Sequence, residues 1–209
     1  MQTKRPVLFS PAFALTIIIA ITITIIVAPT SSFACVGRKL VIGSLKADRP
    51  GMVIRILSIL IHERTGTTVE VKFYPDRDKL LAAVKKNKVD LYVDHVDSAI
   101  DRLKVEVSST EEGERFNAVK RRFEEELNLI WLKPMGYSGI DHDGRSLGAA
   151  SVVVHKDTLK KFPALPRLLE KIGTRVVLDD GRLDSLVKKA RSEKPAKVAR
   201  NYLKEVKLI

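Results

Sequence analysis

Residues 40–66 read LVIGSLKADRPGMVIRILSILIHERTG, and this stretch decides the fold. It opens inside a short β-rich run, residues 38–45, which predicts a buried strand leading into a loop at Gly43 and Ser44. Apolar residues then recur at helical intervals until Gly66, a residue type that commonly ends a helix. The stretch therefore predicts a strand, a loop and a helix in succession.

The residues that follow repeat this pattern. The segment TTVEVKFYP (67–75) alternates apolar and polar residues, as a strand does, and closes at Pro75. Asp76 is placed to cap a helix over residues 77–88, and VDLYV (89–93) predicts a third strand. Three strands separated by two helices predict right-handed βαβ units, hence an α/β fold with a mainly parallel sheet flanked by helices.

Later segments continue the α/β character and suggest domain bounds. A helical stretch precedes the strand NLIWLKP (128–134), and the glycine-rich stretch after it has no periodicity, which predicts a loop. A β-branched strand, a short helix ending at Gly173 and one or two helices around Pro195 follow. We divide the chain into an N-terminal segment, the first part of a lobe, a glycine-rich connector and the end of the same lobe, with bounds 1–37, 38–133, 134–149 and 150–209.

The N-terminal segment has the three-part pattern of a secretory signal. Lys4 and Arg5 precede an uncharged apolar stretch, residues 12–28, and a small-x-Ala motif ends at Ala34. Cleavage, retention as a membrane anchor and lipidation of Cys35 all stay open. We expect export to the periplasm or another extracytoplasmic compartment, in free or membrane-anchored form.

Composition limits the other function classes. Cys35 is the only cysteine, so neither an intramolecular disulfide nor a cysteine-based zinc site can form. Beyond residue 37 the chain holds 35 Lys and Arg against 25 Asp and Glu, a net charge of +10. These charges are spread along helical stretches instead of forming one block, which indicates a solvated basic surface and no nucleic-acid partner.

The stretch KVDLYVDHVDSAIDRL (88–103) places four aspartates around His95. Three of them, Asp94, Asp97 and Asp101, would share one helical face, so a metal site is one interpretation. The spacing lacks the glycine and terminal glutamate of an EF-hand. Capping of the next helix by Asp94 or Asp97, and lining of a ligand pocket, are the other interpretations, and we predict no metal.

Open parallel sheets bind ligands outside the carboxyl ends of their strands. In this chain those ends are GSLKADR (43–49) and DHVDS (94–98), and the helix beginning near residues 48–50 offers free N–H groups suited to an anion. The sequence contains no nucleophile elbow, phosphate-binding loop or HExxH motif. We therefore predict a binding module, not an enzyme, and no cofactor.

Four segments in order resemble the substrate-binding proteins of ABC importers for glycine betaine, choline and related osmoprotectants. The stretch quoted first resembles the family's opening, and VDLYVDHVDSAI (89–100) resembles its IDLYPEYTGTAL. NLIWLKPMGYSG (128–139) is similar to the strand that crosses to the second lobe, and SVVVHKDTLKKFPAL (151–165) to the return segment. The resemblance implies a periplasmic-binding-protein type II fold.

The resemblance also implies which parts are lost. Only the connector, residues 134–149, stands where the family builds its second lobe, which implies a single lobe with the second largely missing. The family's ligand residues map onto Ser44, Asp94, His95 and Ser98, with His95 in place of a tyrosine that helps to cage the cation.

The implied function is an exported, substrate-binding-protein-like component of a glycine betaine or quaternary-amine-type ABC transport system, degenerate in ligand capture. Its expected partners are a small polar solute, such as a quaternary amine, and an ABC permease or other membrane protein. The alternative is a periplasmic protein-interaction module without a transport role, built on the same lobe.

Overall fold

The computed structural model describes residues 39–104, 106–107, 109–140 and 143–209, all within one compact unit, Gly37–Ile209. The predictions made for residues 1–37, including those for Cys35, lie outside the described residues. Within the described ranges, every helix is too short or too polar to cross a lipid bilayer.

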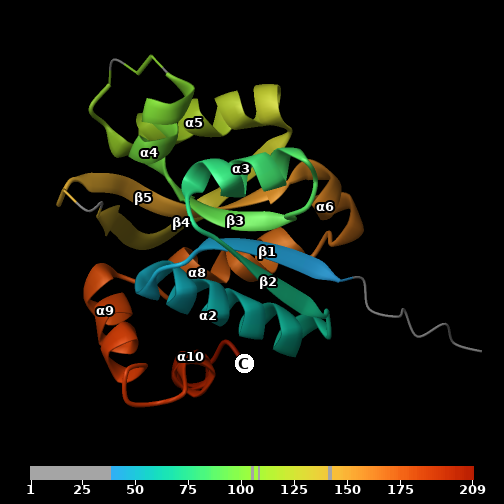
Figure 1. Cartoon of the computed structure of the whole chain (residues 1–209), viewed down its shortest axis with the longest axis vertical. Helices are drawn as coiled ribbons and strands as arrows, with labels where there is room; N and C mark the ends of the chain where they lie inside the picture. The colour runs from blue at the N-terminus through green and yellow to red at the C-terminus, as the bar shows by residue number, and fades with distance from the viewer. Residues whose placement is uncertain (1–38, 105, 108, 141–142) are drawn as a thin grey trace, which may run out of the picture. The chain divides into compact units, whose positions relative to one another are not determined.

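One sheet of five strands forms the centre of this unit (Figure 1). Its order is β2-β1-β3-β5-β4, and β1 pairs in parallel with both β2 and β3. β5 runs antiparallel to β3 and to β4, so four strands share one direction and β5 opposes them. The predicted α/β fold with a mainly parallel sheet is confirmed. The strands are β1 (Leu40–Leu45), β2 (Val69–Tyr74), β3 (Leu91–His95), β4 (Leu129–Ile140) and β5 (Ser146–His155).

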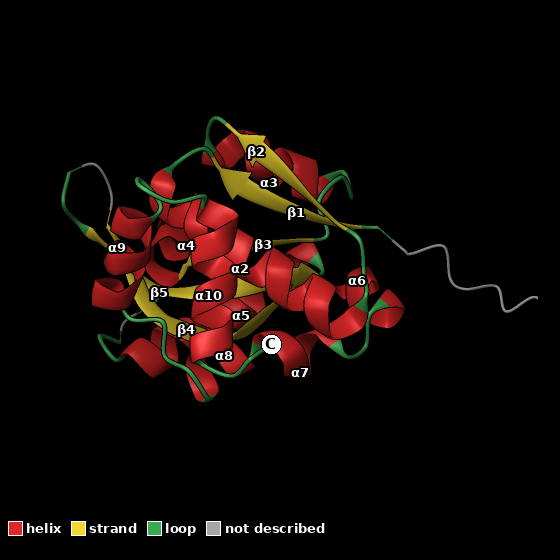
Figure 2. Cartoon of the chain, turned by 90° about the horizontal axis from the view of Figure 1, so that it is seen from below, coloured by secondary structure: helices red, strands yellow, loops and turns green. Residues whose placement is uncertain are grey.

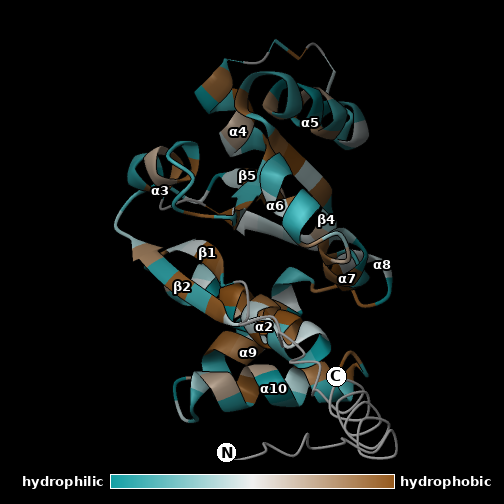
Figure 3. Cartoon of the chain, turned by 90° about the vertical axis from the view of Figure 1, so that its right-hand side faces the viewer, coloured by the Kyte–Doolittle hydropathy of each residue, from teal (hydrophilic) through white to brown (hydrophobic). Residues whose placement is uncertain are grey.

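Helices cover both faces of the sheet and bury two separate apolar clusters. On one face lie α2 (Asp48–Thr65), α7 (Leu165–Leu169), α8 (Lys171–Thr174), α9 (Asp180–Lys189) and α10 (Pro195–Glu205) (Figure 2). On the other lie α3 (Arg77–Lys85), α4 (Val96–Leu103) and α5 (Glu112–Leu127), so the unit has three layers (Figure 3). The short helix α6 (Lys156–Lys161) follows β5 directly.

The predicted ends of the first helices are confirmed. α2 ends at Gly66, whose φ of 67° is the left-handed conformation that glycine adopts without steric cost. Seven apolar side chains between Met52 and Ile61 are buried on its inner face. Asp76 caps α3, because its carboxylate accepts a hydrogen bond from the backbone N–H of Lys79 at 2.8 Å.

The glycine-rich connector is not the irregular loop that its sequence suggests. β4 continues to Ile140 and β5 begins at Ser146, so most of residues 134–149 form an antiparallel hairpin. The pairing shifts register at three points, and Gly136 and Gly148 have φ values of 102° and 76°. Bulges of this kind break the two-residue alternation by which a strand is recognised in a sequence. All strands of the described residues belong to one sheet, as in a single lobe.

Candidate solute-binding site

A cavity of about 730 Å³ lies where β1 and β3 end, the position expected for a ligand in an open α/β sheet. Ser44 of β1 and Ser98 of α4 line it, together with His95 at the junction of β3 and α4. The structure thus brings together three of the four predicted site residues. The fourth, Asp94, is buried beneath the cavity with 1% of its surface exposed.

The Asp94 carboxylate is already occupied by protein groups. It accepts hydrogen bonds from Arg102 of α4 at 3.0 and 3.3 Å and from the backbone N–H of His95 at 3.0 Å. Arg77 of α3 forms a further ion pair with it at 3.4 Å. The Arg102 guanidinium also donates to Ser98 Oγ at 3.2 Å. Asp94 therefore joins α3, β3 and α4 and leaves little capacity for a solute.

Two of the other three aspartates of this stretch have separate structural contacts. Asp90 accepts hydrogen bonds from the Val41 N–H at 2.7 Å and from the Thr158 hydroxyl at 3.0 Å, which ties β3 to β1 and α6. Asp97 pairs with Arg115 of α5 at 2.5 Å. Asp101 is exposed. No three His, Cys, Asp or Glu side chains among the described residues gather closely enough to hold a metal ion.

The interpretation that Asp94 or Asp97 caps α4 is wrong. His95 occupies the N-cap position of α4 and makes no side-chain capping hydrogen bond. Asp94 does not cap because its carboxylate is drawn to Arg102 and Arg77, which offer charge-assisted hydrogen bonds. Asp97 lies within the first turn, where its charge favours the positive end of the helix dipole.

His95 is enclosed between the cavity and the β4–β5 hairpin. Its ring lies edge-on to that of Tyr137, with 5.9 Å between ring centroids, and 8% of the residue is exposed. Gly139 passes so close that a Cβ atom there would lie 2.5 Å from His95 Nε2. Neither ring nitrogen has a hydrogen-bond partner among the described residues. Burial lowers the pKa of His95 to about 4, so the ring is neutral near pH 7.

This pKa makes stability depend on pH. Because His95 has a lower pKa when folded than its ordinary value of 6.5, the unfolded chain takes up a proton below pH 6.5 that the folded chain refuses. We expect the free energy of unfolding to fall by about 2–3 kcal/mol between pH 7.5 and pH 4.5 from this residue alone. Urea unfolding of the wild type and of His95→Phe at both values measures the contribution.

Between pH 7.5 and pH 4.5, the His95→Phe variant should lose about 2–3 kcal/mol less stability than the wild type. His62→Phe is the matched control, because His62 is exposed on α2 and the substitution removes a surface histidine. If the free energy of unfolding falls equally in the wild type and in His95→Phe between pH 7.5 and pH 4.5, His95 takes up its proton in the folded protein as well.

The sequence did not single out Arg49, Arg77 or Tyr137 as site residues, although Arg49 lies in the predicted strand-end segment 43–49. Arg49, in the first turn of α2, forms an ion pair with Asp180 and another with Asp184 of α9 at 3.0 Å. Tyr137 belongs to the hairpin taken for a loop, and burial raises its pKa. Arg77 directly follows the cap of α3, so applying the strand-end rule to β2 would have found it.

The cavity is suited to an anionic group. α2 and α4 both begin at it, and their N-cap residues, Ala47 and His95, provide no side-chain hydrogen bond to the first free N–H groups. Arg49 and Arg77 also line the cavity, but Arg49 is paired with Asp180 and Asp184, Arg77 is paired with Asp94, and Asp76 lies in the lining, so the free N–H groups are the main feature for an anion. Tyr137 is the one aromatic ring besides His95 among the described lining residues, too few to cage a quaternary ammonium ion.

Comparison with known proteins identifies the fold. No family model matches the sequence. A glycine betaine/carnitine/choline ABC transporter structure superposes with a TM-score of 0.69 at 12% identity, covering 82% of this chain and 99% of that one. Apo YehZ from Escherichia coli gives 0.68 at 13% identity, covering 83% and 100%. Lactococcal OpuAC, in its closed form with glycine betaine, gives 0.52 at 10% identity, covering 80% and 96%. The described unit therefore has the fold of glycine betaine-type ABC-transporter binding proteins, arranged as a single lobe around one sheet.

Proposed function

We propose that this chain is an exported, substrate-binding-protein-like component of an ABC transport system that binds a small carboxylate-bearing solute weakly. The observation that carries the proposal is the cavity at the carboxyl ends of β1 and β3, where two uncapped helix N-termini meet Arg49 and Arg77. The fold shared with glycine betaine-type binding proteins supports a transport role outside the cytoplasm. The proposal includes no catalytic step.

Two features of the cavity support weak, degenerate capture. Asp94, at a position that the resemblance assigns to the ligand, is held by Arg77 and Arg102. The ring nitrogens of His95 are covered, with Gly139 of the hairpin against Nε2. A single lobe also leaves one side of the solute in water, which limits the surface that binding removes from solvent.

Isothermal titration of the full chain in nonionic detergent tests the proposal. We expect glycine betaine, carnitine and acetate to bind with dissociation constants on the order of 1 mM, and choline to bind more weakly because it lacks a carboxylate. Arg77→Gln should weaken carboxylate binding about tenfold or more, since a charge-assisted contact is lost.

Lys85→Gln is the matched control, because it removes one positive charge from an exposed position on the same helix, outside the cavity. The absence of heat with every solute would remove the solute role. Stronger binding of choline than of glycine betaine would contradict the carboxylate preference.

A protein-interaction module is the second candidate. Ile140 lines the cavity and is 60% exposed at the end of β4, so it offers an apolar contact at the cavity rim. If this rim binds a partner protein, Ile140→Ser should abolish co-purification of that partner from membranes, while solute titrations stay unchanged. Retention of the same partner by Ile140→Ser would exclude this use of the rim.

A further inference from the structure

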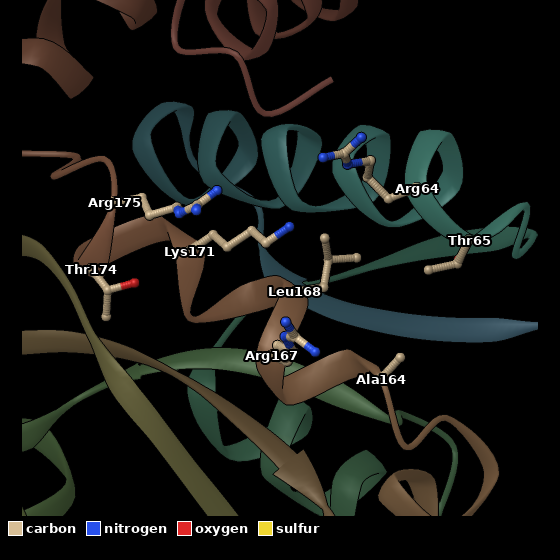
Figure 4. A pocket seen from close by; sticks show the side chains of 8 residues that line it. All are labelled: Arg64, Thr65, Ala164, Arg167, Leu168, Lys171, Thr174 and Arg175. Atoms are coloured by element: carbon tan, nitrogen blue, oxygen red, sulfur yellow. The ribbon is translucent and has the colours of Figure 1, made fainter.

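A second hollow, of about 460 Å³, lies at the other end of α2 from the cavity. Its wall includes Arg64, in the last turn of α2, fifteen residues after Arg49, which corresponds to about 22 Å along a helix. Figure 4 shows the side chains of Arg64, Lys171 and Arg175 in the space between α2 and α8, with Arg167 of α7 beside them. Two threonines, Thr65 and Thr174, complete its polar lining.

The hollow has positive charge without a counter-charge. No Asp or Glu is among its described lining residues. None of its four basic side chains forms an ion pair with another described residue, whereas many other Lys and Arg of this unit do. The carboxylate nearest in sequence to Arg64, that of Glu63, is paired with Arg200 of α10 at 2.5 Å. Four like charges in one hollow repel each other, and a bound anion would relieve that repulsion.

Backbone hydrogen bonds hold the chain at two of these cationic residues. Between Lys171 and Arg175 the chain makes a tight turn in which the Gly173 N–H donates to the Val176 carbonyl at 2.7 Å. Gly173 has a φ of 99° and packs against β4, where an added Cβ would lie 2.0 Å from the Pro134 carbonyl oxygen. The Arg175 N–H donates to the Lys171 carbonyl at 3.0 Å, so the two cationic residues are held across one turn. The backbone positions from which the Lys171 and Arg175 side chains extend are therefore held, which reduces the ordering that anion binding requires.

The geometry points to an anion-binding site in this hollow, with a phosphoryl group as the ligand chemistry. Guanidinium groups match the paired oxygens of a phosphate, and an ammonium adds a point charge. The phosphoryl group could belong to a free phosphate or to the headgroup of an anionic phospholipid. The site is separate from the solute cavity, so neither depends on the other.

Titration of the full chain with sodium pyrophosphate in nonionic micelles at low salt tests the site. The hollow variant carries Arg64→Gln, Arg167→Gln and Lys171→Gln. The control carries Lys85→Gln, Lys86→Gln and Lys88→Gln, which remove the same charge from exposed positions at the end of α3. We expect the dissociation constant for pyrophosphate to rise about tenfold or more in the hollow variant and to change by about twofold or less in the control.

Doping the micelles with phosphatidylglycerol distinguishes the two sources of the phosphoryl group. If the headgroup is the ligand, this lipid competes and weakens pyrophosphate binding, while phosphatidylcholine does not; if free phosphate is the ligand, neither lipid competes. Unfolding curves of both triple variants check that each remains folded. Absence of pyrophosphate binding by the wild type, or an equal loss in the two triple variants, would overturn the proposal.

Discussion

Replacing Asp94 with alanine is expected to lower the free energy of unfolding by about 3–5 kcal/mol. Asp94 has 1% of its side chain exposed, and its carboxylate pairs with Arg102 at 3.0 Å and Arg77 at 3.4 Å. The two arginines expose about a fifth of their side chains, 19% and 23%. The substitution leaves two largely buried cations without their shared anion, which costs more than the loss of the contact alone. Urea unfolding at pH 7.5 measures the change.

Two further variants separate the buried charge from general effects. Asp101→Ala removes the same charge from an exposed position on α4 and should change stability by about 0.5 kcal/mol or less. Adding Arg102→Leu to Asp94→Ala removes one stranded cation and should restore part of the lost stability. If Asp94→Ala costs no more than Asp101→Ala, the ion pairs around Asp94 do not hold α3, β3 and α4 together.

Gly173→Ala should destabilise the protein by about 2–5 kcal/mol. A Cβ atom at this position would lie 2.0 Å from the Pro134 carbonyl oxygen and 3.1 Å from Met135 Cα, and both neighbours are backbone atoms of β4. The φ of 99° is also strained for alanine. Neither cost can be relieved by a side-chain rotation, so the turn after Lys171 must move away from β4. Thermal and urea unfolding both measure the result.

Gly113→Ala is the control for this substitution. Gly113 lies in the first turn of α5, and an added Cβ there would meet nothing within 4 Å. Alanine at this helical position should leave stability unchanged or raise it by up to about 1 kcal/mol. A similar loss at both glycines would mean that the close approach of Gly173 to β4 is not what the substitution disrupts. In the Gly173→Ala variant, displacement of the turn after Lys171 should also weaken pyrophosphate binding in the hollow.

The sequence was sufficient for the elements whose patterns are local. α2 could be bounded because its apolar spacing is helical and Gly66 ends it, and α3 because Asp76 caps it. The position of the cavity followed from a topological rule, since parallel strands place their carboxyl ends together. This rule predicts that residues 43–49 and 94–98 are neighbours, and the resemblance singles out Ser44, His95 and Ser98 within them, all of which line the cavity.

The features that the sequence does not predict depend on contacts between residues far apart in the chain. Asp94 looks like a helix cap until Arg102 and Arg77 are placed beside it, and the choice among these partners depends on tertiary packing. Tyr137 and Gly139 were hidden because the bulged hairpin has no strand periodicity in its sequence. The hollow joins Arg64 to residues about one hundred positions later in the chain, so no sequence window contains it.

The structure shows a lobe with the fold of glycine betaine-type binding proteins, in which protein groups cover part of the predicted site. The β4–β5 hairpin brings Tyr137 and Gly139 over His95, and the arginine pair occupies Asp94. What remains open to a solute is a cavity bounded by two helix N-termini, two arginines that are paired with aspartates, Asp76 and few aromatic faces. This combination favours a carboxylate over a quaternary ammonium group.

Backbone amide chemical shifts, measured by NMR while glycine betaine or choline is added, test this central claim most directly. The account predicts that glycine betaine shifts amide signals at the starts of α2 and α4, in residues 47–49 and 96–98, and that choline shifts them much less. It also predicts no change at Arg64 or Lys171, which line the separate hollow. Equal responses to the two solutes, or glycine betaine shifts confined to residues outside the cavity, would contradict it.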